Sequence, residues 1–310
     1  MNTALSAACN AVLVGLFLVS FGALFGRAHP LIDSFAQFLL PAIVAAAALA
    51  LLAFLTARYT VGLLAVVAIL TNLALVWPWI QSPPASNATG PHFKLLLFNV
   101  FYHNPRLDLV APLARNTNAD IVVLLEVVPR VLANLDELKA DYPYQIEFWS
   151  SVRCDALILS RFPLTDTVAS LPPARARRSL ASATVDVKGR TLTLFAAHFT
   201  LPFPFRNFAD QPAQAEDLAA AITASAGPRL LVGDFNAATW GASMGHIREA
   251  SGLTILTGPG GSWPSMLPRQ MGIPIDHVLA SPELALLSRE LVPVIGSDHR
   301  AVIAEIAFKN

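Results

Sequence analysis

Three long apolar runs near the start of the chain constrain its fold more than any other feature. They cover roughly Ala7–Gly26, Phe38–Ala57 and Val61–Ile80, and none contains a charged residue. At a rise of about 1.5 Å per residue, a helix of about 20 residues crosses a hydrocarbon core of ~30 Å. A helix packed in a globular core would show a polar stripe, which these runs lack. The sequence therefore predicts three transmembrane helices, and so a multi-pass membrane protein.

The charges around these runs give a weak indication of orientation. Arg27 lies in the first loop and Arg58 in the second, so the count of positive residues on the two sides is tied. Arg58 sits in a very tight hairpin at the membrane edge, which favours the cytoplasmic side for that hairpin. The C-terminal part would then lie outside, in the periplasm of a bacterium with this chain in its inner membrane. A cleaved signal peptide is the alternative for the first run, but Met1–Asn10 has no Lys or Arg to begin one.

The remainder of the chain is nearly neutral. Two of the 21 Lys and Arg and one of the 21 Asp and Glu precede Pro91, which leaves 19 and 20 after it. This is not the strongly basic surface of an avid, nonspecific nucleic-acid binder. The local cluster Arg175, Arg177 and Arg178 could touch phosphates or could be a solvated loop. The two cysteines indicate neither a disulfide framework nor a zinc site.

Composition divides the chain into three parts. Residues 81–91 are rich in Pro, Ser, Asn and Gly and show no periodicity, as linkers do. We therefore expect a membrane domain at residues 1–80, this linker, and a globular domain at residues 92–310. That last part is long enough to bury a full core.

The globular part alternates short β-rich runs with helical stretches. Several runs are continuously apolar, as strands covered on both faces are. Helical spacing is found in Leu107–Thr117 and Gln211–Ser225, and the mixture suggests two packed sheets with helices outside them. The predicted strands are Lys94–Val100, Ile121–Val127, Ala156–Ser160, Thr191–His198, Arg229–Val232, Ile275–Leu279 and Ala301–Ile306.

Polar residues recur inside these strands or directly beside them. One such residue alone is usually a turn former, but Glu126 lies within an apolar strand, where an unpaired carboxylate is costly. Together they offer carboxylates, amides and imidazoles without thiolates, which suits Mg²⁺, Mn²⁺ or Ca²⁺ and the hydrolysis of phosphate esters. The set is Asn99, Glu126, His198, Asp234, Asn236, Asp276, His277, Ser297, Asp298 and His299.

The stretch Gly233–Asn236, GDFN, brings an acid and an amide close together after an apolar strand. In extended backbone, residues two apart face the same side. We therefore expect Asp234 and Asn236 to point the same way, above one substrate group.

The order of these residues resembles the endonuclease/exonuclease/phosphatase superfamily, which includes pancreatic deoxyribonuclease, apurinic endonucleases, neutral sphingomyelinases and inositol polyphosphate 5-phosphatases. The resemblance covers Lys94–Phe308 and depends mainly on GDFN and on SDH at Ser297–His299. ADIVVLLEV (Ala119–Val127) and ALILSRFPL (Ala156–Leu164) support it. It implies a four-layer α/β sandwich with two central mixed β-sheets, here preceded by the three transmembrane helices.

The resemblance also implies a divalent cation, Mg²⁺ or Mn²⁺, and its ligands. Glu126 would be the principal metal carboxylate. Asn99 would be its neighbour at the metal and the phosphate, and Asp298 a further carboxylate on the metal side.

Five further residues would do the chemistry by the same resemblance. Asp234 would align or deprotonate the attacking water, and Asn236 would hold that water and the phosphate. His299, polarised by Asp276, would bind the scissile phosphoryl oxygen. His198 would contact the phosphate and assist the leaving group.

The sequence departs from the family pattern in places. Leu125 stands before the metal glutamate where relatives often have Gln, and Arg153–Asp155 lacks a common Gly. His277 has no clear counterpart, so we expect it to face the substrate or to be structural. No departure removes a catalytic group, but together they leave the substrate open.

We therefore expect a membrane-tethered, metal-dependent phosphoester hydrolase that acts as a phosphodiesterase, either endonuclease-like or phospholipase-like. Its substrate would be a nucleic acid or a phospholipid, and no protein partner is predicted. Phe203, Phe205 and Phe208 follow a candidate catalytic histidine and form either a lipid- or base-contacting loop or a packed one. The alternative is a non-catalytic membrane scaffold that keeps the fold. A transporter is a poor third, because the apolar runs contain no charge.

Overall fold

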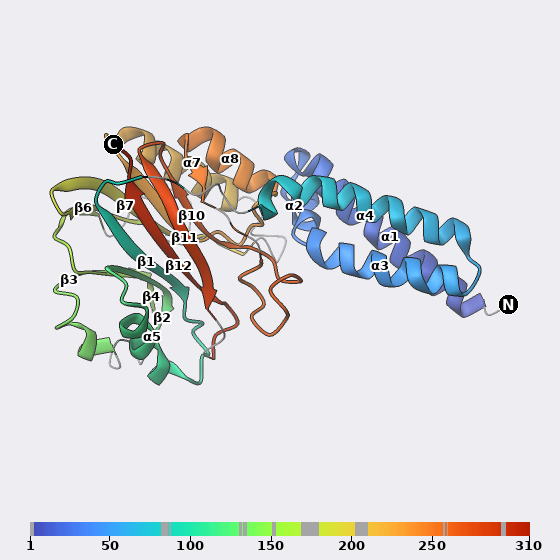
Figure 1. Cartoon of the computed structure of the whole chain (residues 1–310), viewed down its shortest axis with the longest axis horizontal. Coiled ribbons are helices and arrows are strands. Elements are labelled where there is room, and N and C mark those ends of the chain that lie inside the picture. The colour runs from blue at the N-terminus through green and yellow to red at the C-terminus, as the bar shows by residue number, and fades with distance from the viewer. Residues whose placement is uncertain are drawn as a thin grey trace.

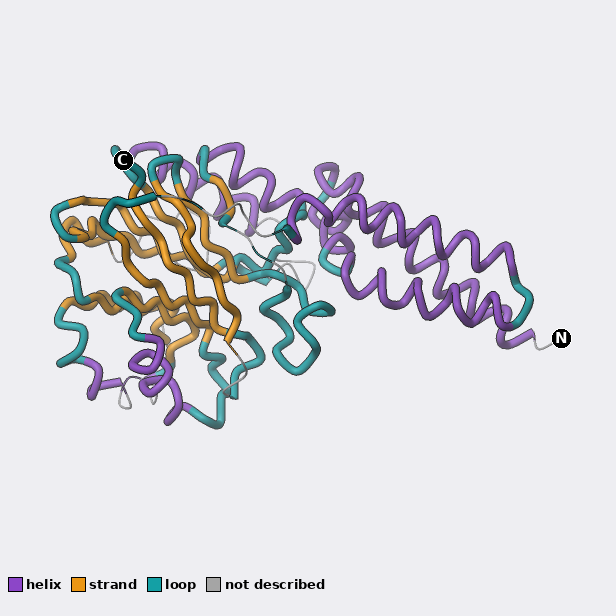
Figure 2. The backbone as a smooth tube through the Cα atoms, in the orientation of Figure 1, coloured by secondary structure: helices purple, strands orange, loops and turns teal. Residues whose placement is uncertain are grey.

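The computed structural model describes residues 3–81, 86, 88–129, 132, 135–150, 153–168, 180–201, 210–256, 258, 260–292 and 296–310. A bundle of helices projects from one side of a two-sheet sandwich (Figure 1). The N-terminus lies at the far tip of the bundle and the C-terminus lies on the sandwich. Figure 2 shows the same division, because the strands all lie in the sandwich and the bundle is drawn as helices with their connecting loops.

The bundle contains the three predicted apolar runs and one short helix that the sequence did not predict. Two of its helices, Thr3–Ala28 and Tyr59–Ile80, are long and apolar enough to cross a membrane. The remaining run forms α3, which has only 17 residues. It is long enough to cross a membrane only when counted together with α2, and the two helices are bent by 56° relative to each other. The elements are α1 (Thr3–Phe25), η1 (Gly26–Ala28), α2 (Pro30–Ala36), α3 (Leu39–Leu55) and α4 (Tyr59–Ile80).

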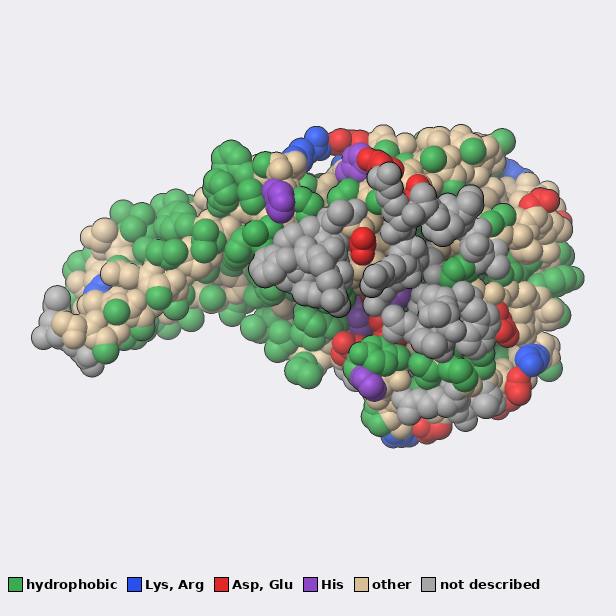
Figure 3. All heavy atoms as spheres, turned by 180° about the vertical axis from the view of Figure 1, so that it is seen from behind, with side chains coloured by type: hydrophobic (Ala, Val, Ile, Leu, Met, Phe, Trp, Pro, Cys, Tyr) green, Lys and Arg blue, Asp and Glu red, His purple; other side chains and the backbone are tan. Residues whose placement is uncertain are grey.

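Small side chains let these helices pack closely, as is common between membrane helices. Ala46 and Ala50 of α3 and Ala65 and Ala68 of α4 belong to one buried cluster. The hydroxyl of Ser20 donates to Oδ1 of buried Asn72 at 2.7 Å, which joins α1 to α4. On the face drawn in Figure 3, the bundle shows many hydrophobic side chains and few charged ones, whereas most of the charged side chains in view lie on the sandwich.

The sandwich contains two six-stranded mixed sheets, in the orders β11-β12-β1-β2-β4-β3 and β5-β6-β7-β8-β10-β9. The pairs β1–β2 and β7–β8 are parallel, and the other neighbours are antiparallel. The strands are β1 (His92–Asn99), β2 (Ile121–Val127), β3 (Tyr144–Ser150), β4 (Arg153–Ser160), β5 (Leu164–Val168), β6 (Leu180–Val187), β7 (Arg190–His198), β8 (Arg229–Asp234), β9 (Thr254–Ile255), β10 (Asp276–Ala280), β11 (Leu284–Val292) and β12 (Ala301–Phe308).

Alternate residues of each central strand enter two different cores. Leu95 and Leu97 of β1 pack between the sheets, where they belong to one cluster with Leu194 of β7. Leu96 and Phe98 point the other way, into a cluster beneath α5. Because both faces are covered, the strands read as continuous apolar runs.

Helices form the two outer layers. Helix α5 packs on the first sheet, and α7 and α8 pack on the second through Leu218 and Ile247. This arrangement confirms the predicted four-layer α/β sandwich. The helices are η2 (Leu107–Leu109), α5 (Val110–Thr117), η3 (Asp136–Leu138), α7 (Asp210–Ala224) and α8 (Ala242–Ser251).

All seven predicted strands and both predicted helices are present, with ends that differ by a few residues at most. The sequence missed β3, β5, β6, β9, β11 and α8. Several of these are edge strands or are rich in small and polar residues, so they lack the apolar pattern on which prediction depends. Arg175, Arg177 and Arg178, and likewise Phe203, Phe205 and Phe208, lie outside the described residues.

Candidate active site

The topology brings the predicted polar residues to one edge of the sandwich. Asn99 and His198 end β1 and β7, and Glu126 lies near the end of β2. Parallel neighbouring strands end at the same edge of a sheet. The polar residues that end β1 therefore lie beside those of β2, and those that end β7 lie beside those of β8. Strand β10 runs antiparallel to β8, which places its first residue, Asp276, directly opposite Asp234, the last residue of β8.

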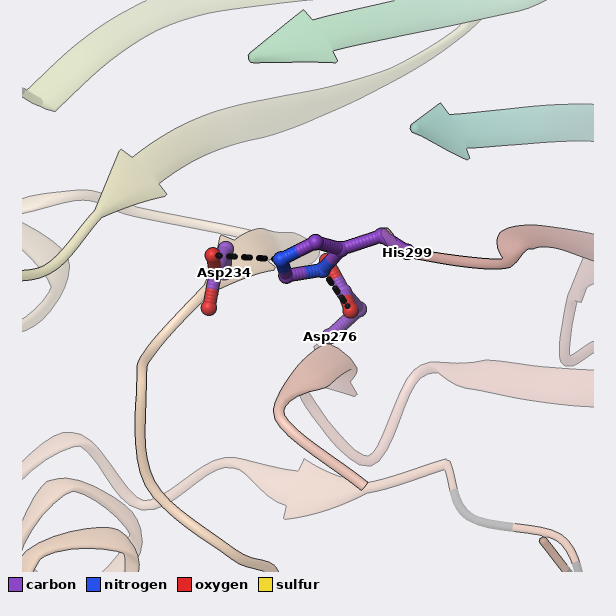
Figure 4. A group of neighbouring side chains, drawn as sticks. All are labelled: Asp234, Asp276 and His299. Atoms are coloured by element: carbon purple, nitrogen blue, oxygen red, sulfur yellow. Dashed lines mark hydrogen bonds and ion pairs between the residues drawn. The ribbon is translucent and has the colours of Figure 1, made fainter. Parts of the chain in front are cut away.

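The centre of the site is a buried group of Asp234, Asp276 and His299 (Figure 4). Nδ1 of His299 lies 2.8 Å from Oδ2 of Asp276, and Nε2 lies 3.8 Å from Oδ2 of Asp234. The imidazole therefore stands between two carboxylates. Burial by itself lowers the pKa of His299, but the charges of Asp276 and Asp234 outweigh it and raise the pKa to about 10.

Asp234 joins most of the other site residues. Its Oδ2 accepts a hydrogen bond from Nδ2 of Asn99 at 3.0 Å and lies 3.8 Å from Nε2 of His198. Burial and the neighbouring charge of Asp276 raise the pKa of the Asp234 carboxyl to about 7, against the opposing effect of His299. A carboxyl with such a pKa can take up and release a proton near neutral pH.

Glu126 holds a strained position at the edge of this group. Its φ is +59°, in the left-handed region, and the pairing of β2 with β4 skips it between Leu125 and Val127. Oε2 of Glu126 accepts from the backbone N–H of Tyr102 at 3.2 Å, and Oε1 lies 3.6 Å from Nε2 of His198. Strain of this kind costs about 1–3 kcal/mol and is concentrated at functional sites.

The expected alignment of Asp234 and Asn236 along one extended strand is wrong. Strand β8 ends at Asp234, and Asn236 has a φ of +48°. The backbone N–H of Asn236 donates to Oδ1 of Asp234 at 2.9 Å, which closes a tight Asx turn. The Asn236 amide donates to the carbonyl of Phe199 at 2.9 Å. A turn, and not strand periodicity, therefore sets the position of Asn236 relative to Asp234.

Asp298 is fixed by a loop that the sequence did not single out. Nε1 of Trp263 donates to Oδ2 of Asp298 at 3.1 Å, and Oδ1 lies 4.0 Å from Nε2 of His299. In the same loop the hydroxyl of Ser262 accepts from the backbone N–H of Asp276 at 3.1 Å. Trp263 and Ser262 lie outside any strand, so no periodic signal in the sequence indicated them.

His277 has a structural position. The residue is 3% exposed, and Nε2 lies 2.8 Å from the carbonyl oxygen of Ala237. A carbonyl can only accept, so Nε2 carries the proton. Burial lowers the pKa of His277 to about 4. His277 thus supports the turn after Asn236 from beneath, and among the described residues its Nε2 bonds to a backbone carbonyl and not to a carboxylate of the site.

The donor set fits a hard divalent cation. Several carboxylates converge here, and Oδ1 of Asp276 and Oδ1 of Asp298 are buried with no hydrogen-bond partner among the described residues. Asp234, Asp276 and His299 offer ligand atoms that all lie within 4.8 Å of one another, a group that could hold a metal ion. This group differs from the predicted ligands, because it includes neither Glu126 nor Asp298.

The fold and the site define a class, that of two-sheet α/β hydrolases of phosphoesters. The chain belongs to the Endonuclease/Exonuclease/phosphatase family, whose model matches residues 96–299, more than half of the chain. No protein with a curated description matches it significantly.

Solved structures share this fold at low identity. An endonuclease/exonuclease/phosphatase from Bacteroides vulgatus is 17% identical over 70% of this chain and 99% of that one, with a TM-score of 0.60. Sphingomyelinase C from Streptomyces griseocarneus is 19% identical over 71% and 100%, with a TM-score of 0.53. A double mutant of beta toxin from Staphylococcus aureus, solved with bound magnesium ions, is 13% identical over 70% and 99%, with a TM-score of 0.56.

Proposed function

We propose that the chain is a membrane-tethered phosphodiesterase that requires a divalent cation, Mg²⁺ or Mn²⁺. The observation that carries this proposal is the buried group of Asp234, His299 and Asp276 beside Glu126 and Asp298. Such a concentration of acids needs a cation to offset it, and acids, amides and imidazoles around a cation suit phosphoester hydrolysis.

The residues of the site would divide the work. Asp234 accepts a proton from the attacking water, which Asn236 helps to hold. His299 donates its Nε2–H to a phosphoryl oxygen, while its Nδ1–H donates to Asp276. His198, 3.6 Å from Glu126 and 3.8 Å from Asp234, faces the phosphate and the leaving group.

For the cation, we propose Glu126 as the principal ligand, with Asn99 and Asp298 beside it. A cation there would offset the charge on the phosphoryl oxygens. Asp276 and His299 already hydrogen-bond each other at 2.8 Å, which favours an acid–base role for that pair.

Binding of Mn²⁺ to the detergent-solubilised full chain tests this assignment. Glu126→Gln should weaken Mn²⁺ binding at least tenfold, and the exposed control Glu216→Gln should leave it unchanged. Loss of affinity in Asp276→Asn with none in Glu126→Gln would instead place the ion in the group of Asp234, Asp276 and His299.

Exposed apolar side chains around the site favour a phosphodiester of a membrane lipid as substrate. Met266 is 83% exposed, Leu201 47% and Tyr102 39%. Each is close to a site residue. Leu201 lies three residues after His198 in the chain, and the backbone N–H of Tyr102 donates to Glu126. The backbone N–H of the residue before Met266 donates to the carbonyl of Asp298. A rim of this kind would sit at the surface of a bilayer.

A panel of phosphoesters, offered to the full chain in detergent, tests the activity. We expect hydrolysis of sphingomyelin or phosphoinositide with Mg²⁺ or Mn²⁺, weaker cleavage of DNA and RNA, and complete loss with EDTA. His299→Ala, purified in parallel, controls for contaminating hydrolases. No hydrolysis and no binding of a divalent cation would favour the non-catalytic scaffold.

The lipid assignment has its own test. Replacing Met266 and Leu201 together with Ser should lower the rate on mixed micelles at least fivefold and leave the rate on a soluble phosphodiester within twofold. Equal loss on both substrates would contradict a lipid-facing rim.

A further inference from the structure

The N-terminal helices do more than tether the sandwich, because α2 packs against the segment that follows the catalytic turn. Helix α2 and helix α8 lie side by side where the bundle meets the sandwich (Figure 1). Residues 237–241 connect Asn236 to α8. Ala238 in this stretch is bonded to the residue after α2, and Ala242, the first residue of α8, is bonded to α2 itself. The segment of residues 237–243 is called here the post-catalytic loop.

Asp33 of α2 caps helix α8 from another part of the chain. Its Oδ1 accepts from the backbone N–H of Ala242 at 2.6 Å, and its Oδ2 accepts from the N–H and hydroxyl of Ser243 at 2.9 and 2.8 Å. The residue at the N-cap of α8 is Gly241, which has no side chain to satisfy these donors. A carboxylate at this place accepts hydrogen bonds from the free N–H groups, and its negative charge interacts favourably with the positive end of the helix dipole.

Gln37 and Ala36 hold the other end of the post-catalytic loop. Oε1 of Gln37 accepts from the backbone N–H of Ala238 at 2.6 Å, only two residues after Asn236. The carbonyl of Ala36 accepts from Nε1 of Trp240 at 2.6 Å. Buried Asp33 and these two contacts leave the loop little freedom to move.

The sandwich holds the same stretch from beneath. His277 donates to the carbonyl of Ala237, and the backbone N–H of Phe235 donates to the carbonyl of Ile275. The turn with Asp234 and Asn236 is therefore held between β10 on one side and α2 on the other. Part of that support comes from far away in sequence, because Gln37 lies 201 residues from Ala238 and Asp33 lies 209 residues from Ala242.

We infer that Asp33 and Gln37 are positioning residues for the catalytic turn, so that the N-terminal helices complete the active site. This inference rests on the proposed function for its kinetic readout. It follows from the geometry that displacement of α2 moves the post-catalytic loop and Asn236 with it. The carboxylates of Asp234 and Asp276 stay in place, because β8 and β10 hold them. Loss of these contacts should lower kcat and leave KM nearly unchanged, because precise placement matters most in the transition state.

The test compares variants of the full chain in detergent on bis(p-nitrophenyl) phosphate with Mn²⁺. Gln37→Leu keeps the size of the side chain but removes the acceptor, whereas Gln37→Glu keeps an acceptor. We expect kcat to fall at least tenfold in Gln37→Leu and in Asp33→Asn, with KM within twofold, and Gln37→Glu to recover most of the loss.

A matched control lies at the same interface. Arg27 pairs with Glu249 of α8, and both side chains are exposed. Arg27→Ala breaks a contact between the same two parts of the chain without touching the post-catalytic loop. Its kcat should stay within twofold of wild type.

Amide hydrogen exchange gives a readout that does not depend on activity. Amides of residues 237–243 should exchange at least tenfold faster in Asp33→Asn than in wild type, and Arg27→Ala should leave them unchanged. If wild type hydrolyses no phosphoester, the proposed function fails, and exchange alone decides whether α2 holds the loop. Unchanged exchange, or faster exchange with wild-type kcat in an active protein, would overturn the inference.

Discussion

At the scale of single residues, the site concentrates acids where water is scarce. Asp234 and Asp276 are each 1% exposed and stand on either side of His299. Burial raises the pKa of Asp234, and the nearby charge of Asp276 raises it further, to about 7. The strand ends that fix these groups hold them together despite the repulsion, and a cation or a phosphate bound with a cation would relieve it.

Asp234→Asn should remove the proton acceptor, and its amide oxygen can still accept the hydrogen bond from the backbone N–H of Asn236 that closes the turn, whereas its NH2 cannot accept from Nδ2 of Asn99. General-base catalysis contributes about 10²- to 10⁴-fold, so kcat should fall by about that factor with the melting temperature nearly unchanged. Asp217→Asn, an exposed site on α7, is the matched control and should keep its full rate. A near-normal rate in Asp234→Asn would overturn the role given to this carboxyl.

The lowered pKa of His277 predicts how the free energy of unfolding depends on pH. Its pKa is about 4 in the folded chain against 6.5 when unfolded, so the unfolded chain binds the proton more readily. Its contribution to stability is present above pH 6.5 and is lost as pH falls towards 4, about 3 kcal/mol in all. His277→Gln should lose less stability than wild type between pH 7 and pH 5 in denaturant unfolding. His246→Gln, an exposed control, should follow wild type. Identical pH dependence in all three chains would refute this account.

At the scale of elements, the site depends on how closely two parallel strands approach. A Cβ added to Gly233 of β8 would lie 1.8 Å from the carbonyl oxygen of Ala197 in β7. No side chain fits there, so glycine lets β7 and β8 pair directly before His198 and Asp234. This close approach of the strands sets the distance between Nε2 of His198 and Oδ2 of Asp234, which is 3.8 Å.

Gly233→Ala should therefore force the two strands apart. Overpacking typically costs 1–3 kcal/mol, and a clash with backbone belongs at the upper end, so we expect a loss of at least about 3 kcal/mol of unfolding free energy. Gly245→Ala in α8 is the control, because among the described residues beyond its own helix the nearest atom to the added Cβ would be 3.8 Å away, on the side chain of Arg27. Stability equal to wild type in Gly233→Ala would show that the strands can adjust.

At the scale of the whole molecule, the Arg58 hairpin and the sandwich lie at opposite ends of the helix bundle. Arg58, in the hairpin between α3 and α4, donates to Ser6 of α1 at 2.6 Å, near the N-terminal tip (Figure 1). The sandwich lies at the other end of the bundle. If the bundle spans a membrane, Arg58 and the catalytic site are on opposite sides of it. The weak preference of Arg58 for the cytoplasm then predicts that the site lies outside.

An enzyme reporter fused after Asn310 tests this orientation in a bacterial host. Alkaline phosphatase, which matures only outside the cytoplasm, should be active in the fusion, and a reporter that works only in the cytoplasm should be inactive. Moving the basic residue, by Arg58→Ser with a new Arg in the first loop, should reduce the phosphatase signal. A fusion active only in the cytoplasm would reverse the assignment.

The sequence by itself determined what depends on local burial. Apolar runs indicated the helices of the bundle, and apolar strands ending in Asn99, Glu126, His198 and Asp234 indicated both the sandwich and most of the site. Each of these signals is local, because a residue's neighbours in sequence show which face of an element is buried.

Only the tertiary structure decided how the pieces meet. It showed that Asp234 and Asn236 are joined by an Asx turn, that Trp263 fixes Asp298, and that Asp33 and Gln37 bind the loop beyond the turn. Asp33 lies in the stretch between two apolar runs, and only the fold sets it beside Gly241. The partners of these groups lie far away in sequence, and hydrogen bonds across such distances leave no periodic trace in the residues around either partner.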